Sequence, residues 1–210
     1  MIISHKNSFI FFAVPKTGTH SIRQALRPHL DENDQEQVGL FVQKQLPYEE
    51  LSRIGHGHIS ARQARPVIGP KQFDLYFKFA FVRNPFDRFV SYCAFMSRHN
   101  DAFVSDPRAF MRFVIRDNPP LQHILFRPQH ELLVGENGGL LMDFVGKVET
   151  MQQDYDRLCE RLGIPGQALE RVNASSHGHY ADYYDSDLVA RVGDFYGRDL
   201  ELFGYRFGDK

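Results

Sequence analysis

A short polar stretch near the start of the chain has the residue types of an anion-binding loop. The uncharged apolar run 9–14 and Pro15 precede a group of small polar and basic residues, namely Lys16, Thr17, Gly18, Thr19 and Ser21. Apolar residues recur at helical spacing directly afterwards, so the pattern predicts a buried strand, a polar loop and a helix N-terminus. Free backbone N–H groups and the helix dipole favour an anion at such a terminus. We therefore expect an anion site here.

The order of residues in this loop differs from that of the Walker A motif. That motif places its lysine after the second glycine, whereas Lys16 precedes Gly18, the only glycine of the loop. From the residues alone, the loop could equally belong to a generic phosphate-binding strand, loop and helix.

Two histidines, His56 and His58, flank a single glycine, Gly57, and would lie on one side of an extended chain. A zinc site would need a third and a fourth ligand, and nothing nearby provides a matched pair. A structural histidine in a glycine-rich turn is a second interpretation. The third is a general base, because histidine has an ordinary pKa of about 6.5 and can accept a proton near neutrality.

A third stretch begins where the apolar run 73–82, a second predicted strand, ends at Arg83. Pro85 can open a helix, and Ser91 would lie two turns into it. Ligands of α/β sheets bind at the carboxyl ends of strands, and a guanidinium can donate two parallel hydrogen bonds to a phosphate. The alternatives are a surface arginine and an ordinary helical serine. Arg88 is either a surface ion-pair partner of Asp87 or of another side chain, or a second contact to a ligand.

The remaining pattern supplies elements that would position these residues. We expect a short helix over 48–54, a third strand over 140–147, a helix over 150–162 and a last helix from about 185. Strands followed by loops and helices predict an α/β fold, a P-loop-like parallel sheet flanked by helices. The length of 210 residues fits one domain over residues 1–210.

Taken together, the three stretches resemble the motifs of sulfotransferases that use 3′-phosphoadenosine 5′-phosphosulfate (PAPS). The loop 15–21 resembles the 5′-phosphosulfate loop, and the segment from Arg83 to Ser91 resembles the 3′-phosphate motif over nine residues. The segment from His56 to Ser60 is similar to a stretch of the carbohydrate branch, that of the heparan sulfate 2-O-sulfotransferases. The resemblance extends from about residue 9 to residue 205.

This resemblance implies a role for each candidate residue. His58 would be the catalytic base, with His20 as a lesser alternative, and His56 would be an accessory histidine that contacts the substrate. Arg83 and Ser91 would bind the 3′-phosphate. The 5′-phosphosulfate would be held by Lys16, which is also catalytic, and by Thr17, Gly18, Thr19, His20 and Ser21. Ser175 and Ser176 would contact phosphate or adenosine from a polar loop.

The activity so implied is transfer of a sulfuryl group from PAPS to a hydroxyl acceptor, without a metal. A glycan is the favoured acceptor through the His56 to Ser60 resemblance alone. The variable region at about 95–141 would shape the acceptor pocket, although its basic residues equally fit a solvated helical face. A Mg-dependent nucleotide kinase and an inactive PAPS-binding module are the alternatives.

Composition excludes several other classes of protein. The chain has 25 Lys and Arg against 26 Asp and Glu, a net charge of −1, which disfavours a nucleic-acid-binding protein. Cys93 and Cys159 are expected to be buried free thiols rather than a disulfide or zinc framework. The N-terminal residues lack a signal-peptide pattern, and no apolar run approaches the about 20 residues of a membrane span. We therefore expect a cytoplasmic protein.

Overall fold

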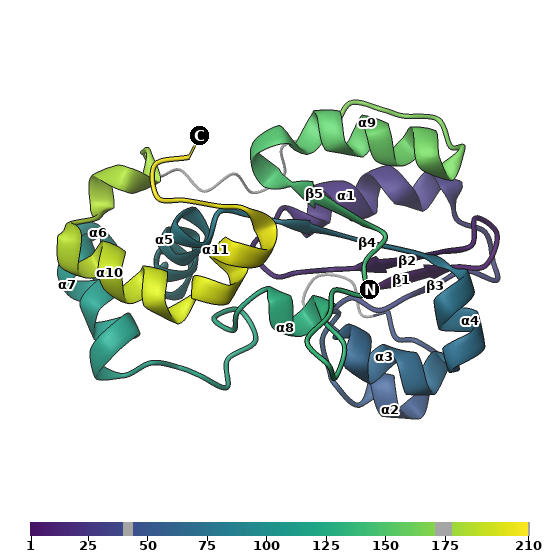
Figure 1. Cartoon of the computed structure of the whole chain (residues 1–210), viewed down its shortest axis with the longest axis horizontal. Helices are drawn as coiled ribbons and strands as arrows, with labels where there is room; N and C mark the ends of the chain where they lie inside the picture. The colour runs from purple at the N-terminus through teal and green to yellow at the C-terminus, as the bar shows by residue number, and fades with distance from the viewer. Residues whose placement is uncertain (40–43, 171–177, 210) are drawn as a thin grey trace. The chain divides into compact units, whose positions relative to one another are not determined.

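The computed structural model describes residues 1–39, 44–170 and 178–209 (Figure 1). The strands are β1 (Ile2–Ser4), β2 (Phe9–Phe12), β3 (Gln35–Glu36), β4 (Phe77–Val82) and β5 (Phe144–Lys147). The α-helices are α1 (Thr19–Leu26), α2 (Glu49–Ser52), α3 (Ala61–Ile68), α4 (Pro70–Leu75), α5 (Pro85–Met96), α6 (Ala102–Ser105), α7 (Pro107–Arg112), α8 (His130–Leu133), α9 (Met151–Leu162), α10 (Ser186–Phe195) and α11 (Gly197–Phe203). Short 3-10 or π turns are η1 (Arg27–His29), η2 (Phe113–Asp117), η3 (Val148–Thr150) and η4 (Tyr180–Tyr183).

Contacts between residues divide the chain into two compact units. Unit 1 comprises residues 1–82 and 129–172, and unit 2 comprises residues 83–128 and 173–210. The expectation of one domain over residues 1–210 stays a prediction.

Unit 1 is built on a mixed sheet with the strand order β3-β1-β2-β4-β5. β2, β4 and β5 run parallel, with Phe12 opposite Ala80 and Val82 opposite Lys147. The chain therefore leaves all three strands at the same edge of the sheet. The predicted P-loop-like parallel sheet flanked by helices is confirmed for these strands. β1 pairs antiparallel with both β2 and β3 and adds an antiparallel part that the sequence did not predict.

Helices cover both faces of this sheet, α1 and α9 on one and α2, α3 and α4 on the other (Figure 1). Alternate residues of the strands explain the two faces. Phe11 and Phe79 pack with Ile22 of α1 and Tyr155 of α9. Phe12 points the other way, and its ring centroid lies 6.1 Å from that of Phe73 in α4. Each such buried side chain contributes about 1.5–3 kcal/mol, so both faces stabilise the sheet.

Two strand boundaries differ from the prediction. Phe73 belongs to α4 and not to a strand, because Gly69 has a φ of +94° and Pro70 opens a helical turn before β4 begins at Phe77. Phe73 is fully buried, and its apolar side chain made the predicted strand begin too early, at residue 73. The third strand begins at Phe144 and not at residue 140, since Leu140 forms only an isolated bridge with Val134. The helix predicted over 150–162 is present as α9.

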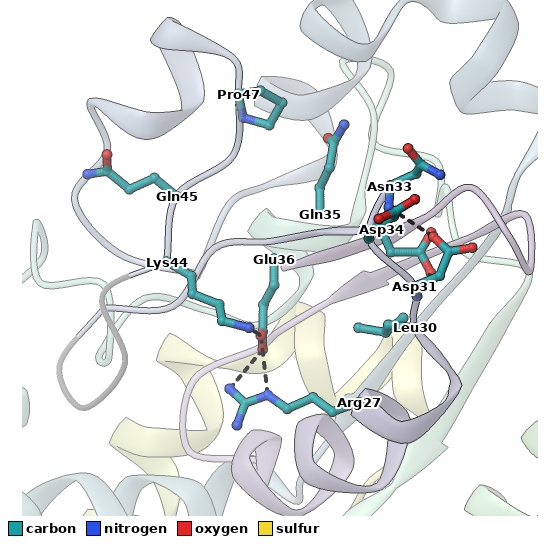
Figure 2. A pocket seen from close by; sticks show the side chains of 11 residues that line it. Arg27, Leu30, Asp31, Asn33, Asp34, Gln35, Glu36, Lys44, Gln45 and Pro47 are labelled. Atoms are coloured by element: carbon teal, nitrogen blue, oxygen red, sulfur yellow. Dashed lines mark hydrogen bonds and ion pairs between the residues drawn. The ribbon is translucent and has the colours of Figure 1, made fainter.

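The segment between α1 and α2 carries a charged cluster around Glu36 of β3. Arg27 donates to both oxygens of the Glu36 carboxylate, at 3.2 and 3.1 Å, and Lys44 Nζ lies 3.4 Å from it (Figure 2). These residues line an open hollow of about 780 Å³ together with the acidic stretch 31–36. None of the residues predicted to bind PAPS or the acceptor lines this hollow.

Unit 2 is a helical unit with an aromatic core around α5. Phe86, Phe89, Phe126, Tyr184 and Tyr196 are buried in this core. Tyr184 Oη donates to the Phe86 carbonyl at 2.8 Å, and Tyr196 Oη donates to the Phe126 carbonyl at 2.7 Å. The phenol hydroxyls therefore bond the packed segments to each other.

Several basic residues of the variable region have partners inside unit 2. Arg112 forms an ion pair with Asp185, and Arg116 forms one with Asp117 at 2.6 Å. Arg108 reaches the Asp182 carbonyl at 3.4 Å. These contacts favour a structural role for the three arginines, and a role of residues 95–141 in acceptor binding stays a prediction.

Gly146 of β5 gives a test of the packing in unit 1. A Cβ there would lie 2.5 Å from Cε1 and 2.7 Å from Cδ1 of the buried Phe81 ring. We expect Gly146→Ala to lower the free energy of unfolding by about 1–3 kcal/mol through overpacking, measured by urea denaturation. Gly197→Ala is the control, because a Cβ at Gly197 would meet open space. Equal losses of stability in both variants would contradict this account.

Candidate functional site

The loop between β2 and α1 is held in an unusual backbone conformation. Lys16 and Gly18 both have a φ of +67°. A non-glycine residue in this region costs energy, of order 1–3 kcal/mol, and such residues concentrate at functional sites. A Cβ on Gly18 would also lie 2.5 Å from the Met151 side chain, so glycine is required there by both space and conformation. The conformation at Lys16 is therefore maintained by its surroundings.

Internal hydrogen bonds fix the loop. Thr17 is fully buried, and its hydroxyl donates to the Val14 carbonyl at 2.9 Å. The Gly18 carbonyl accepts from the N–H groups of Ser21 and Ile22, at 3.0 and 3.4 Å. The hydroxyl proton of Thr17 is therefore already donated within the protein.

The N-terminus of α1 has no side-chain cap among the described residues. Gly18 is its N-cap residue, whereas Ser60 caps α3, Asn84 caps α5 and Asp185 caps α10 through side-chain oxygens. The first turn of α1 also lacks an acidic side chain. An anion at such a terminus gains about 0.3–1 kcal/mol from the helix dipole. The loop and α1 therefore form a site with the hydrogen-bonding groups and the field that an anion needs.

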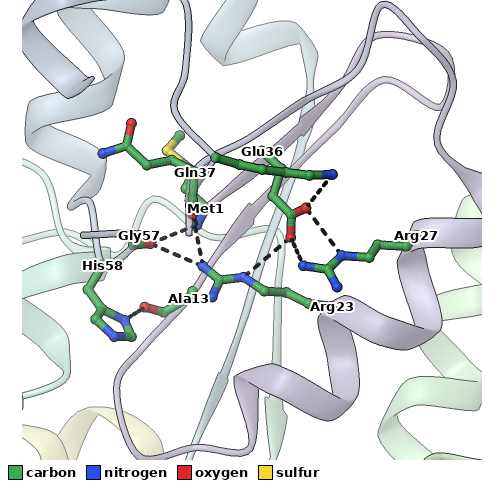
Figure 3. Close-up of polar contacts among 9 residues, drawn as sticks. Met1, Ala13, Arg23, Arg27, Glu36, Gln37, Gly57 and His58 are labelled. Atoms are coloured by element: carbon green, nitrogen blue, oxygen red, sulfur yellow. Dashed lines mark hydrogen bonds and ion pairs between the residues drawn. The ribbon is translucent and has the colours of Figure 1, made fainter. Parts of the chain in front are cut away.

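His58 is bonded to the strand that leads into this loop. Its Nδ1 lies 2.7 Å from the carbonyl oxygen of Ala13, the residue after β2 (Figure 3). A carbonyl can only accept, so Nδ1 carries the hydrogen, and Nε2 of the neutral ring has the lone pair. Burial lowers the pKa of His58 to about 3, against the opposing effect of the Ala13 hydrogen bond. The charges of the Met1 amino group and Arg23 lower it further. Near neutral pH His58 is therefore an uncharged proton acceptor.

His56 has the opposite tautomer. The backbone N–H of His58 donates to His56 Nδ1 at 3.3 Å, so the neutral His56 ring carries its hydrogen on Nε2. Burial lowers the pKa of His56 as well, and the two ring centroids are 5.8 Å apart. The pair therefore presents one ring nitrogen that donates, on His56, and one that accepts, on His58.

His20 lies in the first turn of α1, where Thr19 is half-buried and Ser21 is buried. Burial lowers the pKa of His20, and the neighbouring charges of Arg23 and Arg27 add to this effect. Unit 1 thus brings together the predicted loop residues Lys16 to Ser21 and, through the bond to Ala13, His58 with its neighbour His56.

Arg83 and Ser91 belong to unit 2. Arg83 directly follows the last residue of β4, and its Nε donates to Asp87 Oδ2 at 2.7 Å across one turn of α5. Ser91 lies in α5 and is 3% exposed. This ion pair orients Arg83, the residue predicted to bind the 3′-phosphate. The sequence analysis did not connect Asp87 with Arg83. The spacing of four residues was the signal that could have identified this pair.

Arg88 is not a surface ion-pair partner of Asp87, and that interpretation was wrong. The side chain is 1% exposed and donates to the carbonyls of Leu125 and Arg127, at 3.0 and 2.9 Å. The carboxylate of Asp87 is bonded to Arg83 instead. Arg88 therefore anchors the segment 125–127 to α5, because a buried guanidinium needs several acceptors.

Other predictions concern groups away from these contacts. Ser175 and Ser176 lie outside the described residues. The described part of the chain contains no cluster of three or more His, Cys, Asp or Glu that could hold a metal ion. Within the same residues, no helix combines the length and the apolar character that crossing a membrane requires. The prediction that Cys93 and Cys159 are buried free thiols is confirmed.

Comparison with known proteins gives the family of this chain. An uncharacterized protein of Archaeoglobus fulgidus is 27% identical over 116 residues, which are 55% of this chain and 92% of that protein. No solved structure matches the chain. The sequence profile of the sulfotransferase family matches residues 1–206, the region that contains both the loop after β2 and the paired histidines. The chain therefore belongs to the sulfotransferase family.

Proposed function

We propose that the protein transfers the sulfuryl group of PAPS to a hydroxyl group of an acceptor, with a glycan as the favoured acceptor class. One observation carries this proposal. An uncharged histidine, His58, is bonded through Nδ1 to Ala13 at the start of an anion-binding loop. The loop supplies groups for the donor, and His58 supplies a proton acceptor from the same unit.

The loop residues would bind the phosphosulfate of the donor. Lys16 and the backbone N–H groups at the start of α1 would hold its oxygens and neutralise the charge that develops on the departing phosphate. His20 and Ser21 lie in the first turn of α1, within this field. Loss of one such preorganised donor typically costs about 10²–10³ in rate, so this loop would contribute much of the catalysis.

His58 would accept the proton of the acceptor hydroxyl at Nε2. The acceptor oxygen forms a bond to sulfur while the bond between sulfur and the phosphate oxygen breaks, and 3′-phosphoadenosine 5′-phosphate leaves. His56 would donate from Nε2 to an oxygen of the acceptor. A bound anion favours the charged form of a nearby histidine, so the donor itself would raise the pKa of His58 and strengthen this base.

Arg83 and Ser91 would bind the 3′-phosphate that distinguishes PAPS from ADP and ATP. The ion pair with Asp87 fixes the guanidinium, which is 15% exposed, and leaves its planar fork oriented before a ligand binds. A bidentate guanidinium contact suits a phosphate in a way that a lysine ammonium does not.

A nucleotide kinase on the same strand, loop and helix would need Mg²⁺ and the Walker A order, which this loop lacks. An inactive module would bind the nucleotide without turnover. The two alternatives are separated from sulfuryl transfer by the measurements below.

The first prediction for this proposed function concerns the base, His58. His58→Asn should lower turnover by about 10²-fold or more because general-base catalysis is typically worth about 10²–10⁴-fold. Calorimetric binding of 3′-phosphoadenosine 5′-phosphate should stay within about threefold of the wild type, since His58 acts on the acceptor. His20→Asn is the comparison. A larger loss of turnover in His20→Asn than in His58→Asn would assign the base to His20.

The second prediction concerns pH. His58 is held neutral in the folded state, whereas the unfolded chain binds a proton near the ordinary histidine pKa of about 6.5. The His58 contribution to stability is therefore lost as pH falls from about 6.5 towards the folded-state value of about 3. The difference in unfolding free energy between the wild type and His58→Asn should shrink over this range, by at most about 1.4 kcal/mol per pH unit. A difference independent of pH would contradict the neutral state of His58.

The third prediction concerns the 3′-phosphate. In metal-free buffer with a chelator, Arg83→Lys should weaken binding of 3′-phosphoadenosine 5′-phosphate by about tenfold or more while leaving binding of adenosine 5′-phosphate unchanged, because one bidentate contact is lost. Asp87→Asn keeps Arg83 and removes only its ion pair, so this variant measures how much the orientation of the guanidinium contributes to binding of the 3′-phosphate. Equal binding of ADP by the wild type, or binding only with Mg²⁺, would favour the kinase.

A further inference from the structure

Arg23 of α1 is a buried cation that neither the loop nor the proposed proton transfer uses. Its side chain leaves the middle of α1, and the residue is 4% exposed. Burial lowers the pKa of its guanidinium to about 10, so the group stays charged at neutral pH. Removing such a charge from water is costly, and replacing a buried ion pair by apolar side chains of similar volume is often neutral or stabilising, so stability alone does not account for an arginine there.

The hydrogen bonds of Arg23 go to two backbone carbonyls rather than to an acid. Nη2 donates to the carbonyl of Gln37 at 3.2 Å and to that of Gly57 at 3.4 Å (Figure 3). The Met1 amino group donates to the same two oxygens, at 3.1 and 2.7 Å. Gly57 is the residue between His56 and His58, so its carbonyl belongs to the peptide that immediately precedes the proposed base.

Glu36 balances the charge of Arg23 without fixing its position. Arg23 Nε lies 3.9 Å from Glu36 Oε1 and has no hydrogen-bond partner among the described residues. The carboxylate is instead held by two hydrogen bonds from Arg27. The direction of the Arg23 guanidinium is therefore set by the carbonyls of Gln37 and Gly57.

Gly57 is packed closely against Gln37 and Arg23. A Cβ on Gly57 would lie 2.2 Å from the Gln37 carbonyl oxygen and 2.6 Å from Arg23 Nη2. The peptide is thus packed against the guanidinium that donates to it. A shift of the segment from His56 to His58 would require Arg23 to move as well.

We propose that Arg23 is the positioning residue for the catalytic base: it fixes the peptide between Gly57 and His58 to the helix that begins at the donor-binding loop. This proposal rests on the sulfuryl transfer proposed above. The His58 ring is held by Ala13 at the end of β2, and its backbone is held by Arg23 from α1. The base and the anion-binding loop are therefore attached to the same strand and the same helix.

The charge of Arg23 has a second effect on His58. The charged or titratable groups that influence His58 are the Met1 amino group, Arg23 and His56, and each of them lowers its pKa. Substitution of Arg23 by a neutral residue should thus change the titration of His58 as well as its position. The titration therefore reports the electrostatic effect of Arg23, whereas a loss of kcat at unchanged nucleotide binding reports its effect on the position of the base.

The test compares Arg23→Gln, Arg23→Lys and Arg27→Gln with the wild type. Arg27→Gln is the matched control, because Arg27 belongs to the same Glu36 cluster and, within the described part of the chain, its side-chain hydrogen bonds go to Glu36 and not to Gly57. Turnover, calorimetric binding of 3′-phosphoadenosine 5′-phosphate and the NMR titration of the His58 ring are measured for each protein, with urea denaturation to give the folded fraction.

We expect Arg23→Gln to lower kcat by about 10–100-fold, since a misplacement of about 1 Å can cost 10²-fold in rate. Nucleotide binding should stay within about threefold, and the His58 titration should move to higher pH. Arg23→Lys, which keeps the charge, should retain the wild-type titration and recover part of kcat. Arg27→Gln should resemble the wild type in both kcat and the His58 titration.

The proposal is overturned if folded Arg23→Gln has wild-type kcat, whatever its His58 titration, or if Arg27→Gln loses as much activity. If Arg23→Gln does not fold, Arg23→Lys decides, because full recovery of kcat by a single ammonium would exclude the requirement for a guanidinium between two carbonyls. Failure of the proposed function itself would look different. The wild type would then bind no 3′-phosphoadenosine 5′-phosphate, while the His58 titration would still report the effect of Arg23.

Discussion

The hydrogen bond from His58 Nδ1 to the Ala13 carbonyl connects the segment that carries His56 and His58 to the loop between β2 and α1. Ala13 follows Phe12, the last residue of β2, and the loop that leads to α1 begins two residues later. One bond of 2.7 Å thus fixes the tautomer of the histidine and its distance from the loop. Without it, the ring would be free to exchange its donor and acceptor nitrogens, and the proposed base would carry its lone pair on Nε2 only part of the time.

This arrangement depends on buried polar groups that are bonded to backbone carbonyls. Arg23 donates to Gln37 and Gly57, and in unit 2 Arg88 donates to Leu125 and Arg127. A backbone carbonyl accepts a hydrogen bond without carrying a full negative charge, so these guanidinium groups keep their positive charge. In unit 1 the charge of Arg23 acts on His58 and His20. The pKa of both histidines is lowered first by burial, and the cation that orders the backbone adds to this effect.

Local patterns of the sequence were sufficient to predict the strands that carry the motifs and the helices that follow them. β2, β4 and α9 are predicted because an apolar run, or helical spacing, is a property of neighbouring residues. The antiparallel strand β1 was not predicted, since Ile2–Ser4 is too short to show alternation. The partners of Arg23, Arg88 and His58 are separated from them by 14 to 45 residues, and no local pattern encodes such pairs. The motif residues were accessible to sequence reasoning, whereas the residues that position them were not.

The low pKa of His58 in the free protein is consistent with a base that acts only when a donor is bound. Burial and the cations around the ring all oppose protonation. An anionic phosphosulfate in the loop after Ala13 would place negative charge near the same ring, and opposite charges within about 4–6 Å favour the charged imidazolium. The proton would then be accepted at the moment when the donor is present and the sulfur can be attacked. On this view, the negative charge of the donor offsets the field of the cations that lower the pKa of His58 in the free protein. Binding of the donor would therefore also activate the base.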